Sequence, residues 1–481
     1  MSLRLSDEQL FDFLRCPRRS WLEAYGDPSR REPPSEYLLK LGRDSRQHRA
    51  EAAAAYDPVA VTARDPAGAA AETLALMKDG VAAIAGGWLQ GEAEGVTLEA
   101  RPDLLLRQPG RSWWGDWHYV PLVIKLGKSP KPEYGLQVAL AALLLEQNQG
   151  LRPREAWLLL RQKGLCRVNL DLRLEQLREV LPLWRSLLRR NQPPEPFIAR
   201  KRCSLCQWHS DCYAQARAVN HLCLLPGVSE RRYELLSELG VTALAELAAA
   251  DSDWLEQFEG LEDGVGRKLI RQARSTLSGQ PIQHGAPAFV LPRQPLELYF
   301  DIEAEPERDL AYLHGVLVVE GDRSHFRPLL AEQPEAEAEA WQGLLDLFER
   351  FDRAPIFHFC DFEVSSLRKL GDRFGTEPER VERIRQRMVD LHAAVVQSVT
   401  LPVESYALKH LARWLGFDWR DDEANGAESI SWYDHWLNSG DRRHLERILI
   451  YNEDDCRATW HLKQWLTDFL DGAMVDGSDR M

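Results

Sequence analysis

The chain has 481 residues, of which 44% are hydrophobic and 28% charged, and its formal net charge at pH 7 is −14. This length exceeds what one ordinary hydrophobic core accommodates, so we expect two to four domains in a globular protein. The negative balance excludes a passive coat that covers DNA regardless of sequence, because such proteins need a net positive surface.

Changes in composition divide the chain into three parts. Residues 1–215 mix helix and strand patterns, residues 216–285 have helical patterns only, and a Pro-rich linker (HGAPAFVLPRQPLE) leads to a second α/β region at 290–481. An Ala-rich stretch near 51–86 predicts a helix interrupted by a loop. No apolar run is long enough to cross a bilayer and the first residues lack a secretory pattern, so we expect no membrane contact and a cytoplasmic location.

Three of the eight cysteines are clustered in CSLCQWHSDC, where Cys203, Cys206 and Cys212 have the spacing C-x2-C-x5-C. In a reducing compartment such clustering indicates a metal centre rather than disulfides. Cys16, in FLRCPRRSWL at the other end of the same region, is the candidate fourth ligand. Four thiolates suit either zinc or a [4Fe–4S] cluster, and their spacing alone does not choose between them.

One N-terminal cysteine followed by this C-terminal triplet resembles the iron–sulfur RecB-type nucleases. The resemblance covers residues 1–215 and implies a restriction-endonuclease-like α/β domain of the PD-(D/E)XK type. It also implies [4Fe–4S] rather than zinc, with a mainly structural role for the cluster.

The same resemblance assigns a nuclease site with one defect. Asp103 in LEARPDLLLR resembles the metal-binding acid, Lys125 in WHYVPLVIKLGK the lysine, Gln137 in GLQVALAALLL the glutamine and His48 in GRDSRQHRAE the upstream histidine. Where the second acid belongs stands Val123, and Ala141 replaces the expected aromatic residue. A valine cannot ligate a metal, so affinity for Mg²⁺ should fall sharply.

Three interpretations of this defect stay open. The domain is an inactive nuclease that binds DNA, or another acid such as Glu99 or Glu133 substitutes, or Val123 belongs to an altered but active lineage. We favour the first. A separate basic segment comprises Arg185, Arg189, Arg190, Arg200, Lys201 and Arg202. It fits either a surface that follows a phosphate backbone or a solvated helix end.

The middle region contains the turns LPGV and LEDGVG between helical patterns, and Arg267 and Lys268 follow the second turn. These turns resemble helix–hairpin–helix modules, whose turn amides hold a DNA phosphate without reading the base sequence. An ordinary helical hairpin that packs two domains together fits the pattern equally well.

The C-terminal region places acids in a series of strands and helices. LELYFDIEAE predicts a strand with Asp301 and Glu303 on one face, and AYLHGVLVVEGD predicts its neighbour. APIFHFCDFEVSSLRKL predicts a strand feeding a helix with Glu363 near its start. In RILIYNEDDCRATWHLKQWL, Tyr451 and Asp455 are four residues apart and share one helix face.

This order of acids resembles the DEDDy exonucleases of the RNase H-like fold. The resemblance implies 3′–5′ cleavage of nucleic acid through two Mg²⁺ or Mn²⁺ ions, with Asp301, Glu303 and Asp455 as metal ligands and Tyr451 positioning water. Asp361 competes with Glu363 for the third position, and Asp454 competes with Asp455 for the fourth. Lys409 in SYALKHLARWL is a candidate phosphate contact, whereas Asp390 in MVDLH is expected to cap a helix.

Nearly the whole chain resembles a bacterial family of RecB-like nucleases with an RNase H-like domain behind the iron–sulfur domain. The function we predict is a metal-dependent 3′–5′ exonuclease whose front domain binds nucleic acid, with DNA favoured over RNA. The alternative is a non-catalytic, nucleic-acid-binding iron–sulfur scaffold. The sequence identifies neither protein partners nor the oligomeric state.

Overall fold

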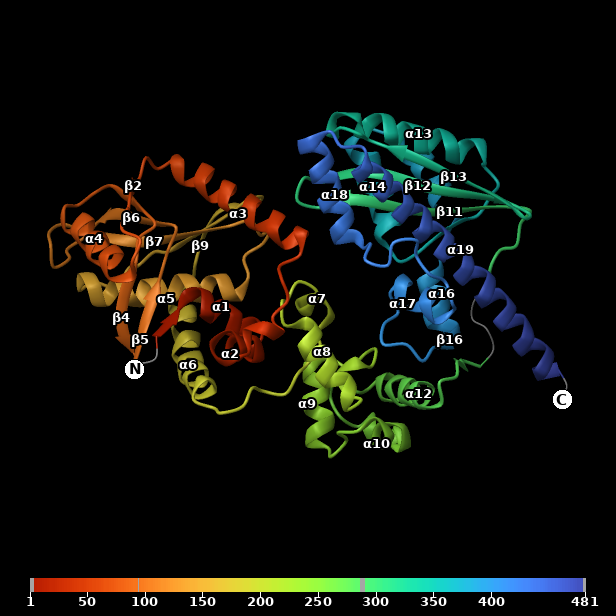
Figure 1. The fold of residues 1–481 in the computed structure, drawn as a ribbon, viewed down its shortest axis with the longest axis horizontal. Coiled ribbons are helices and arrows are strands. Elements are labelled where there is room, and N and C mark those ends of the chain that lie inside the picture. The colour runs from red at the N-terminus through yellow and green to blue at the C-terminus, as the bar shows by residue number, and fades with distance from the viewer. Residues whose placement is uncertain (1–3, 94, 286–289, 479–481) are drawn as a thin grey trace. The chain divides into compact units, whose positions relative to one another are not determined.

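The computed structural model describes residues 4–93, 95–285 and 290–478, so residues 286–289 of the predicted linker lie outside the described part. The chain forms two compact units, residues 1–215 and 216–481. Each is described by itself, and Figure 1 labels their elements. None of the helices in the described ranges combines the length and the apolar character that a membrane crossing requires.

The first unit contains two sheets. A three-stranded sheet has the order β1-β5-β4, and a six-stranded sheet has the order β2-β3-β6-β7-β8-β9. The strands are β1 (Arg4–Ser6), β2 (Val59–Ala60), β3 (Ala83–Ala85), β4 (Leu89–Ala93), β5 (Val96–Ala100), β6 (Leu104–Pro109), β7 (Trp117–Lys125), β8 (Trp157–Leu160) and β9 (Gly164–Arg167).

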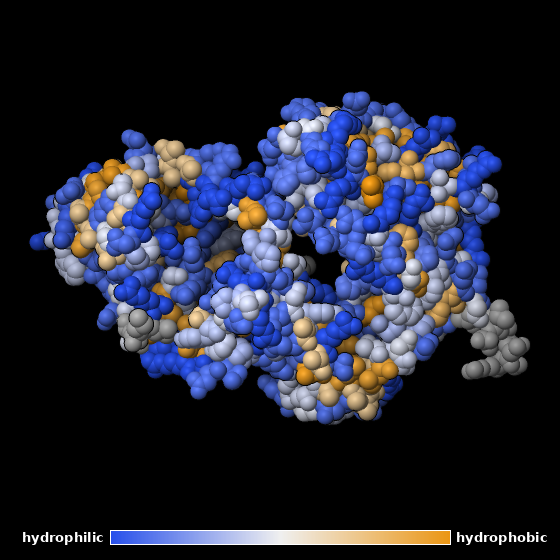
Figure 2. Space-filling model, viewed as in Figure 1, coloured by the Kyte–Doolittle hydropathy of each residue, from blue (hydrophilic) through white to orange (hydrophobic). Residues whose placement is uncertain are grey.

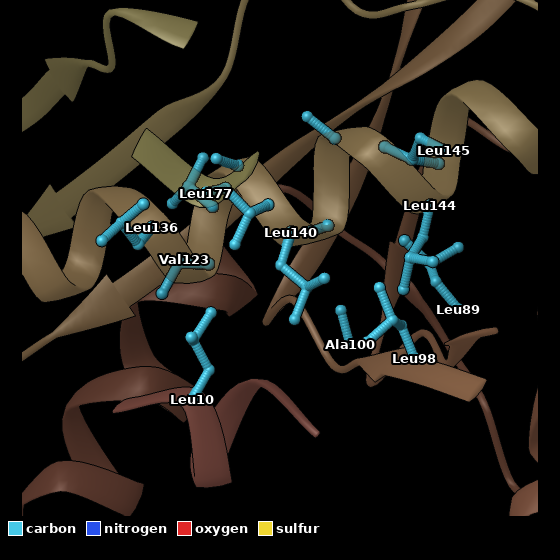
Figure 3. Packing of buried hydrophobic residues seen from close by; sticks show 14 of the residues in the cluster. Leu10, Leu89, Leu98, Ala100, Val123, Leu136, Leu140, Leu144, Leu145 and Leu177 are labelled. Atoms are coloured by element: carbon cyan, nitrogen blue, oxygen red, sulfur yellow. The ribbon is translucent and has the colours of Figure 1, made fainter. Parts of the chain in front are cut away.

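Helix α5 is the centre of this unit and contacts strands of both sheets. Its sequence is apolar on nearly every side, which is typical of a helix buried all round. Figure 3 shows Leu136 and Leu140 of this helix near Val123, and Leu144 towards Leu89, and all of them belong to the same buried cluster. The helices of the unit are α1 (Asp7–Arg15), α2 (Pro17–Tyr25), α3 (Glu36–Ala54), α4 (Pro66–Lys78), α5 (Pro132–Gln149), α6 (Leu170–Leu188), α7 (Arg200–Cys203) and α8 (His209–Ala218), which runs past the unit boundary.

The second unit begins with short helices around a core of their own, which includes Leu236 and Leu269. This part of the chain is helical in the structure. Gln272 in the last of them donates a hydrogen bond of 2.8 Å to the carbonyl of Leu401, which ties this helix to the following region. The helices are α9 (Glu230–Glu238), α10 (Leu244–Ala249), α11 (Ser252–Leu255) and α12 (Val265–Ser278).

A five-stranded sheet of order β13-β12-β11-β14-β15 forms the rest of the unit, with a small pair, β10-β16, beside it. Strands β11, β12 and β13 are antiparallel, whereas β14 and β15 continue the sheet in parallel with β11. The strands are β10 (Ile282–Gln283), β11 (Leu296–Glu305), β12 (Leu310–Glu320), β13 (Arg323–Leu330), β14 (Ile356–His358), β15 (Met388–Asp390) and β16 (Val399–Thr400).

Helices pack on both faces of this sheet, α13 on one and α19 on the other (Figure 1). Leu298, Phe300 and Ile302 of β11 join the core beneath α13, while Tyr299 joins the core beneath α19. Alternation therefore turns Asp301 and Glu303 towards α19. The helices are α13 (Glu337–Arg350), α14 (Phe362–Arg373), α15 (Pro378–Arg385), α16 (Leu391–Ser398), α17 (Leu408–Trp414), α18 (Gly426–Ser439) and α19 (Arg443–Ser478).

The face of the molecule seen in Figure 2 is mostly hydrophilic, and its hydrophobic residues form small scattered patches. Such patches are ordinary on the surfaces of globular proteins.

Candidate active site

Strand β11 and helix α19 bring three carboxylates together. One ligand oxygen from each of Asp301, Glu303 and Asp455 lies within 4.8 Å of the other two. Among the described residues, this is the only group of three or more cysteine, histidine, aspartate or glutamate side chains with that proximity. Oxygen ligands at this separation suit a divalent cation such as Mg²⁺ or Mn²⁺.

Glu363 is a fourth acid beside this triad. It lies in the first turn of α14 and only 3% of it is exposed, while one of its carboxylate oxygens is buried without a hydrogen-bond partner. Its negative charge raises the pKa of both Asp301 and Glu303. The Nδ1 atom of His358 is 3.6 Å from its carboxylate.

The two competing acids point elsewhere. Asp361 precedes α14 and is exposed to solvent. Asp454 is buried, but its carboxylate accepts hydrogen bonds of 2.9 and 2.8 Å from the backbone and the guanidinium of Arg420. Of the adjacent pair on α19, Asp455 is therefore the one that joins the cluster.

The acidic cluster is electrostatically strained without a cation. Burial raises the pKa of Asp301 well above its ordinary range, and the charge of Asp455 raises it further. Burial and the same neighbour raise the pKa of Glu303 to about 8, and burial raises the pKa of Asp455 to about 7. Buried like charges of this kind are relieved by a bound metal ion, so the donor set fits the group that the sequence predicts.

Polar side chains around the cluster were not predicted from the sequence. Asn452 donates a hydrogen bond of 2.6 Å to Asp301 and one of 3.5 Å to Glu303, and Trp419 donates one of 2.7 Å to Asp455. Asn452 could have been suspected, because it neighbours Tyr451. Trp419 lies in a loop without a spacing signal.

Three other residues singled out in the sequence have defined contacts in the structure. Tyr451 hydrogen-bonds to Asp455, and burial raises the pKa of its phenol well above the ordinary value. The amino group of Lys409 is held by the carbonyls of Asp422 and Ala424 at 2.9 and 2.6 Å, which leaves it less free for phosphate. The cap predicted for Asp390 is confirmed at the start of α16.

In the first unit, the predicted nuclease residues converge around β6 and β7. Asp103 precedes β6 and accepts a hydrogen bond of 2.6 Å from the backbone of Ile124, while Lys125 ends β7. The charge of Asp103 raises the pKa of both Lys125 and His48, against the stronger lowering by burial. Val123 is 5% exposed and packs among apolar side chains such as Leu10 (Figure 3).

Asp7 is an acid at this location that sequence reasoning missed. It is 7% exposed, one carboxylate oxygen is buried without a partner, and burial raises its pKa to about 6. Its charge acts on Lys125, and its carbonyl accepts a hydrogen bond of 2.9 Å from Gln137. In the sequence it is indistinguishable from an ordinary first-turn acid of α1.

The four cysteines of the predicted metal centre gather in the first unit. Cys16 lies between α1 and α2, and Cys203, Cys206 and Cys212 lie in and around α7 and α8. Burial raises the pKa of Cys203 to about 11, and the charges of Cys16 and Cys206 act in the same direction. Among the described residues, no three cysteine sulfurs all lie within 4.8 Å of one another.

Comparison with known proteins bears on the C-terminal region. A sequence model of the RNase H superfamily matches residues 298–467, which contain most of β11, all of α14 and most of α19. Curated proteins gave no match to the chain. The C-terminal region is therefore an RNase H-like domain in a mixed α/β multidomain chain, and it indicates a nucleic-acid-hydrolysing function.

Proposed function

We propose that the chain is a metal-dependent nuclease whose C-terminal domain removes nucleotides from the 3′ end of a nucleic acid. The observation that carries the proposal is the convergence of Asp301, Glu303 and Asp455 within 4.8 Å, inside the region matched to the RNase H superfamily. Fold alone does not define a reaction, but a buried carboxylate triad on this fold supports phosphodiester hydrolysis.

Asp301, Glu303 and Asp455 would hold Mg²⁺ or Mn²⁺. The bound ions would supply an activated water and charge neutralisation at the leaving oxygen. Asn452 orients the two strand acids, and Trp419 orients Asp455 through its indole N–H. Tyr451, hydrogen-bonded to Asp455, is placed to hold a proton-bearing group such as water at the edge of the cluster.

The first unit is proposed to bind the substrate rather than to cut it. Val123 is part of the packed core, so the position of the second acid is filled by apolar contacts. Asp103 and Lys125 lie beside it, and the charge of Asp103 acts on Lys125. Asp7 offers a carboxylate from α1 that Glu99 does not, because Glu99 is engaged by Gln90 and Arg4. DNA is the substrate we favour over RNA.

A [4Fe–4S] cluster is the group we propose for the four cysteines. The resemblance of Cys16 and the C-x2-C-x5-C triplet to the iron–sulfur RecB-type nucleases supports this choice over zinc. The Nε of Arg18 lies 3.3 Å from the sulfur of Cys212 and would stabilise a thiolate there.

The helical middle is proposed to hold a DNA phosphate. Gly264 adopts a left-handed conformation immediately before α12, as a tight turn between two helices requires. Arg267 behind it is paired with Glu256 at 2.8 Å, so the contribution to phosphate binding would come from backbone amides.

The second candidate function is a nucleic-acid-binding scaffold without catalysis, and the buried Val123 is the observation that favours it for the first unit. One assay distinguishes the two candidate functions. Single-stranded DNA and RNA labelled at the 5′ end would be incubated with Mg²⁺ or Mn²⁺, and 3′ trimming would appear as a descending ladder.

We expect Asp301→Ala to reduce trimming roughly 1000-fold or more, because a lost metal ligand removes several kcal/mol of transition-state stabilisation. Asp361→Asn is the matched control, since this exposed acid lies beside the site but outside the cluster. Asp103→Ala should retain trimming. Activity lost in Asp103→Ala but kept in Asp301→Ala would reassign the site to the first unit.

A further inference from the structure

A groove lies at one end of the six-stranded sheet of the first unit. It consists of two cavities of about 670 and 560 Å³, which share Leu151, Arg152, Arg154 and Arg167 as lining residues. Pro109 at the end of β6 and His118 at the start of β7 line the second cavity.

The groove is distinct from the predicted nuclease residues of the same unit. Asp103 and Lys125 lie at the opposite ends of β6 and β7. Six residues of strand separate Asp103 from Pro109, which corresponds to about 20 Å. The groove is therefore separate from the predicted nuclease residues of this unit.

Arginines outnumber acids on the walls of the groove, where Glu155 and Asp171 are the acidic lining residues, although the chain carries a net charge of −14. Arg111, Arg152, Arg154 and Arg167 all line it and are exposed. Arg152 is paired with Glu146 at 2.7 Å and Arg167 with Glu155 at 3.5 Å. Arg111 and Arg154 form no ion pair with any carboxylate of the described residues, so they are available to an anionic ligand.

An exposed tryptophan lines neither cavity but neighbours the groove, because its ring lies against Gly150, which precedes the lining residue Leu151. Trp113 follows Arg111 by two residues, and 69% of it is exposed, more than any other aromatic side chain in the described part of the chain. Its backbone N–H donates a hydrogen bond of 3.1 Å to Gln149. Its indole lies directly against Gly150, where any added Cβ would collide with the ring. The ring is thus held in place while one side remains open to solvent.

We propose that this groove binds a segment of single-stranded nucleic acid, with phosphates on Arg111 and Arg154 and a base stacked on Trp113. Arginines that track a backbone, combined with an exposed aromatic platform, are the general means of binding single strands regardless of sequence. A duplex offers its phosphates but keeps its base faces stacked, so it would use the arginines alone. The inference rests on the proposed function only in its choice of nucleic acid as ligand.

The test measures binding of a fluorescein-labelled oligo-dT 20-mer to the full chain by fluorescence anisotropy. EDTA is present so that no hydrolysis occurs, and the salt concentration is varied. Trp113→Ala should weaken binding roughly 5- to 150-fold, whereas Trp113→Phe, which retains an aromatic face, should bind nearly as the unchanged protein does. Arg111→Ala/Arg154→Ala should lower the slope of log affinity against log salt by about 0.7 for each arginine.

Arg178→Ala is the matched control, because this arginine is exposed on α6 of the same unit but does not line the groove. It should leave both affinity and salt slope unchanged. Equal binding by the unchanged protein, Trp113→Ala and Arg111→Ala/Arg154→Ala would overturn the inference, as would the absence of binding. Unchanged thermal midpoints verify that these surface variants are folded.

The outcomes for the groove and for the proposed function are separable. Asp301→Ala should bind the oligonucleotide in EDTA as the unchanged protein does, since it lies in the other unit. If the groove variants bind more weakly but the unchanged protein trims no substrate, the groove is a binding site and the nuclease proposal is wrong. If the unchanged protein trims substrate but the groove variants bind as tightly as it does, the nuclease proposal holds and the groove is not the binding site.

Discussion

Asp301, Glu303 and Asp455 place three carboxylates where burial alone disfavours each negative charge. Such an arrangement lowers the stability of the cation-free protein, because charged groups removed from water without partners cost free energy. Natural proteins keep such destabilising arrangements where a function depends on them. The raised pKa values are thus the residue-scale sign that the cluster is built to receive positive charge.

His314 is a buried titratable group away from the cluster. It is fully buried on β12 with both ring nitrogens unpaired, its ring stacks with Phe300 at 6.3 Å, and burial lowers its pKa from 6.5 to about 4. The unfolded chain binds a proton at pH values where the folded chain does not. Stability contributed by the neutral ring is therefore present above pH 6.5 and is lost as the pH falls towards 4.

His314→Phe should remove this pH dependence while it retains the stacking. Relative to the variant, we expect the unchanged protein to lose about 2 kcal/mol of unfolding free energy between pH 7 and pH 5. Denaturant unfolding of both proteins over this pH range measures the difference in their free energies of unfolding. The pH dependence that comes from acids present in both proteins cancels in this comparison. A difference that stays constant with pH would contradict a buried neutral histidine.

At the scale of elements, α19 depends on close approach to β12. Gly315 lies opposite Asp301 in the sheet register, and a Cβ at this glycine would collide with the side-chain amide of Asn452. The amide can reach Asp301 and Glu303 only because this position lacks a side chain. The same close approach of α19 to β12 brings Asp455 near Asp301 and Glu303.

Gly315→Ala should therefore displace Asn452 and, with it, the turn of α19 that carries Asp455. We expect a loss of about 1–3 kcal/mol of unfolding free energy, as for other overpacked positions, together with weaker Mn²⁺ binding. Calorimetric titration with Mn²⁺ and thermal unfolding measure the two effects.

Gly472→Ala is the control for Gly315→Ala, since it lies on α19 with open space around it. It should stabilise the protein by up to about 1 kcal/mol through helix propensity and leave Mn²⁺ binding unchanged. Equal Mn²⁺ affinity in both glycine variants would show that the position of Asn452 does not depend on Gly315.

Local patterns predicted the elements of the C-terminal region but not all of their contacts. Alternation identified β11 and β12, and the four-residue spacing identified the α19 face of Tyr451 and Asp455. The spacing from Tyr451 favours Asp455 over Asp454, but the hydrogen bonds that hold Asp454 come from Arg420, which is distant in sequence. The partnership of Gly315 with Asn452 joins a strand to a helix, and no local period encodes it.

In the first unit, too, contacts between residues distant in sequence could not be predicted. A family resemblance assigned Asp103 and Lys125 to one site, and in the structure they lie at neighbouring ends of β6 and β7. Asp7 could not be predicted, since its approach to Lys125 depends on how α1 packs against α5. The structure brings the four cysteines into one place, but which metal group they hold stays a prediction.

At the scale of the whole molecule, the cysteines connect the two ends of the first unit. Cys16 and the triplet from Cys203 to Cys212 are separated by most of that unit in sequence. A metal centre that joins them would close a loop of almost 200 residues, which stabilises the folded state on the order of 5 kcal/mol by restricting the unfolded chain. The second unit contains the acidic cluster and would not share this stabilisation directly.

Cys203→Ser should consequently lower the thermal midpoint of the first unit and the iron content of anaerobically purified protein, while 3′ trimming by the second unit persists. Cys166→Ser is the matched control, because Cys166 is a partly buried cysteine on β9 outside the group. Elemental analysis for iron and zinc, with thermal unfolding, distinguishes the variants. Zinc in place of iron would exclude the [4Fe–4S] assignment but keep the structural role. Identical metal content and midpoints in the two cysteine variants would eliminate the metal centre itself, because only the four gathered thiols can account for a difference between them.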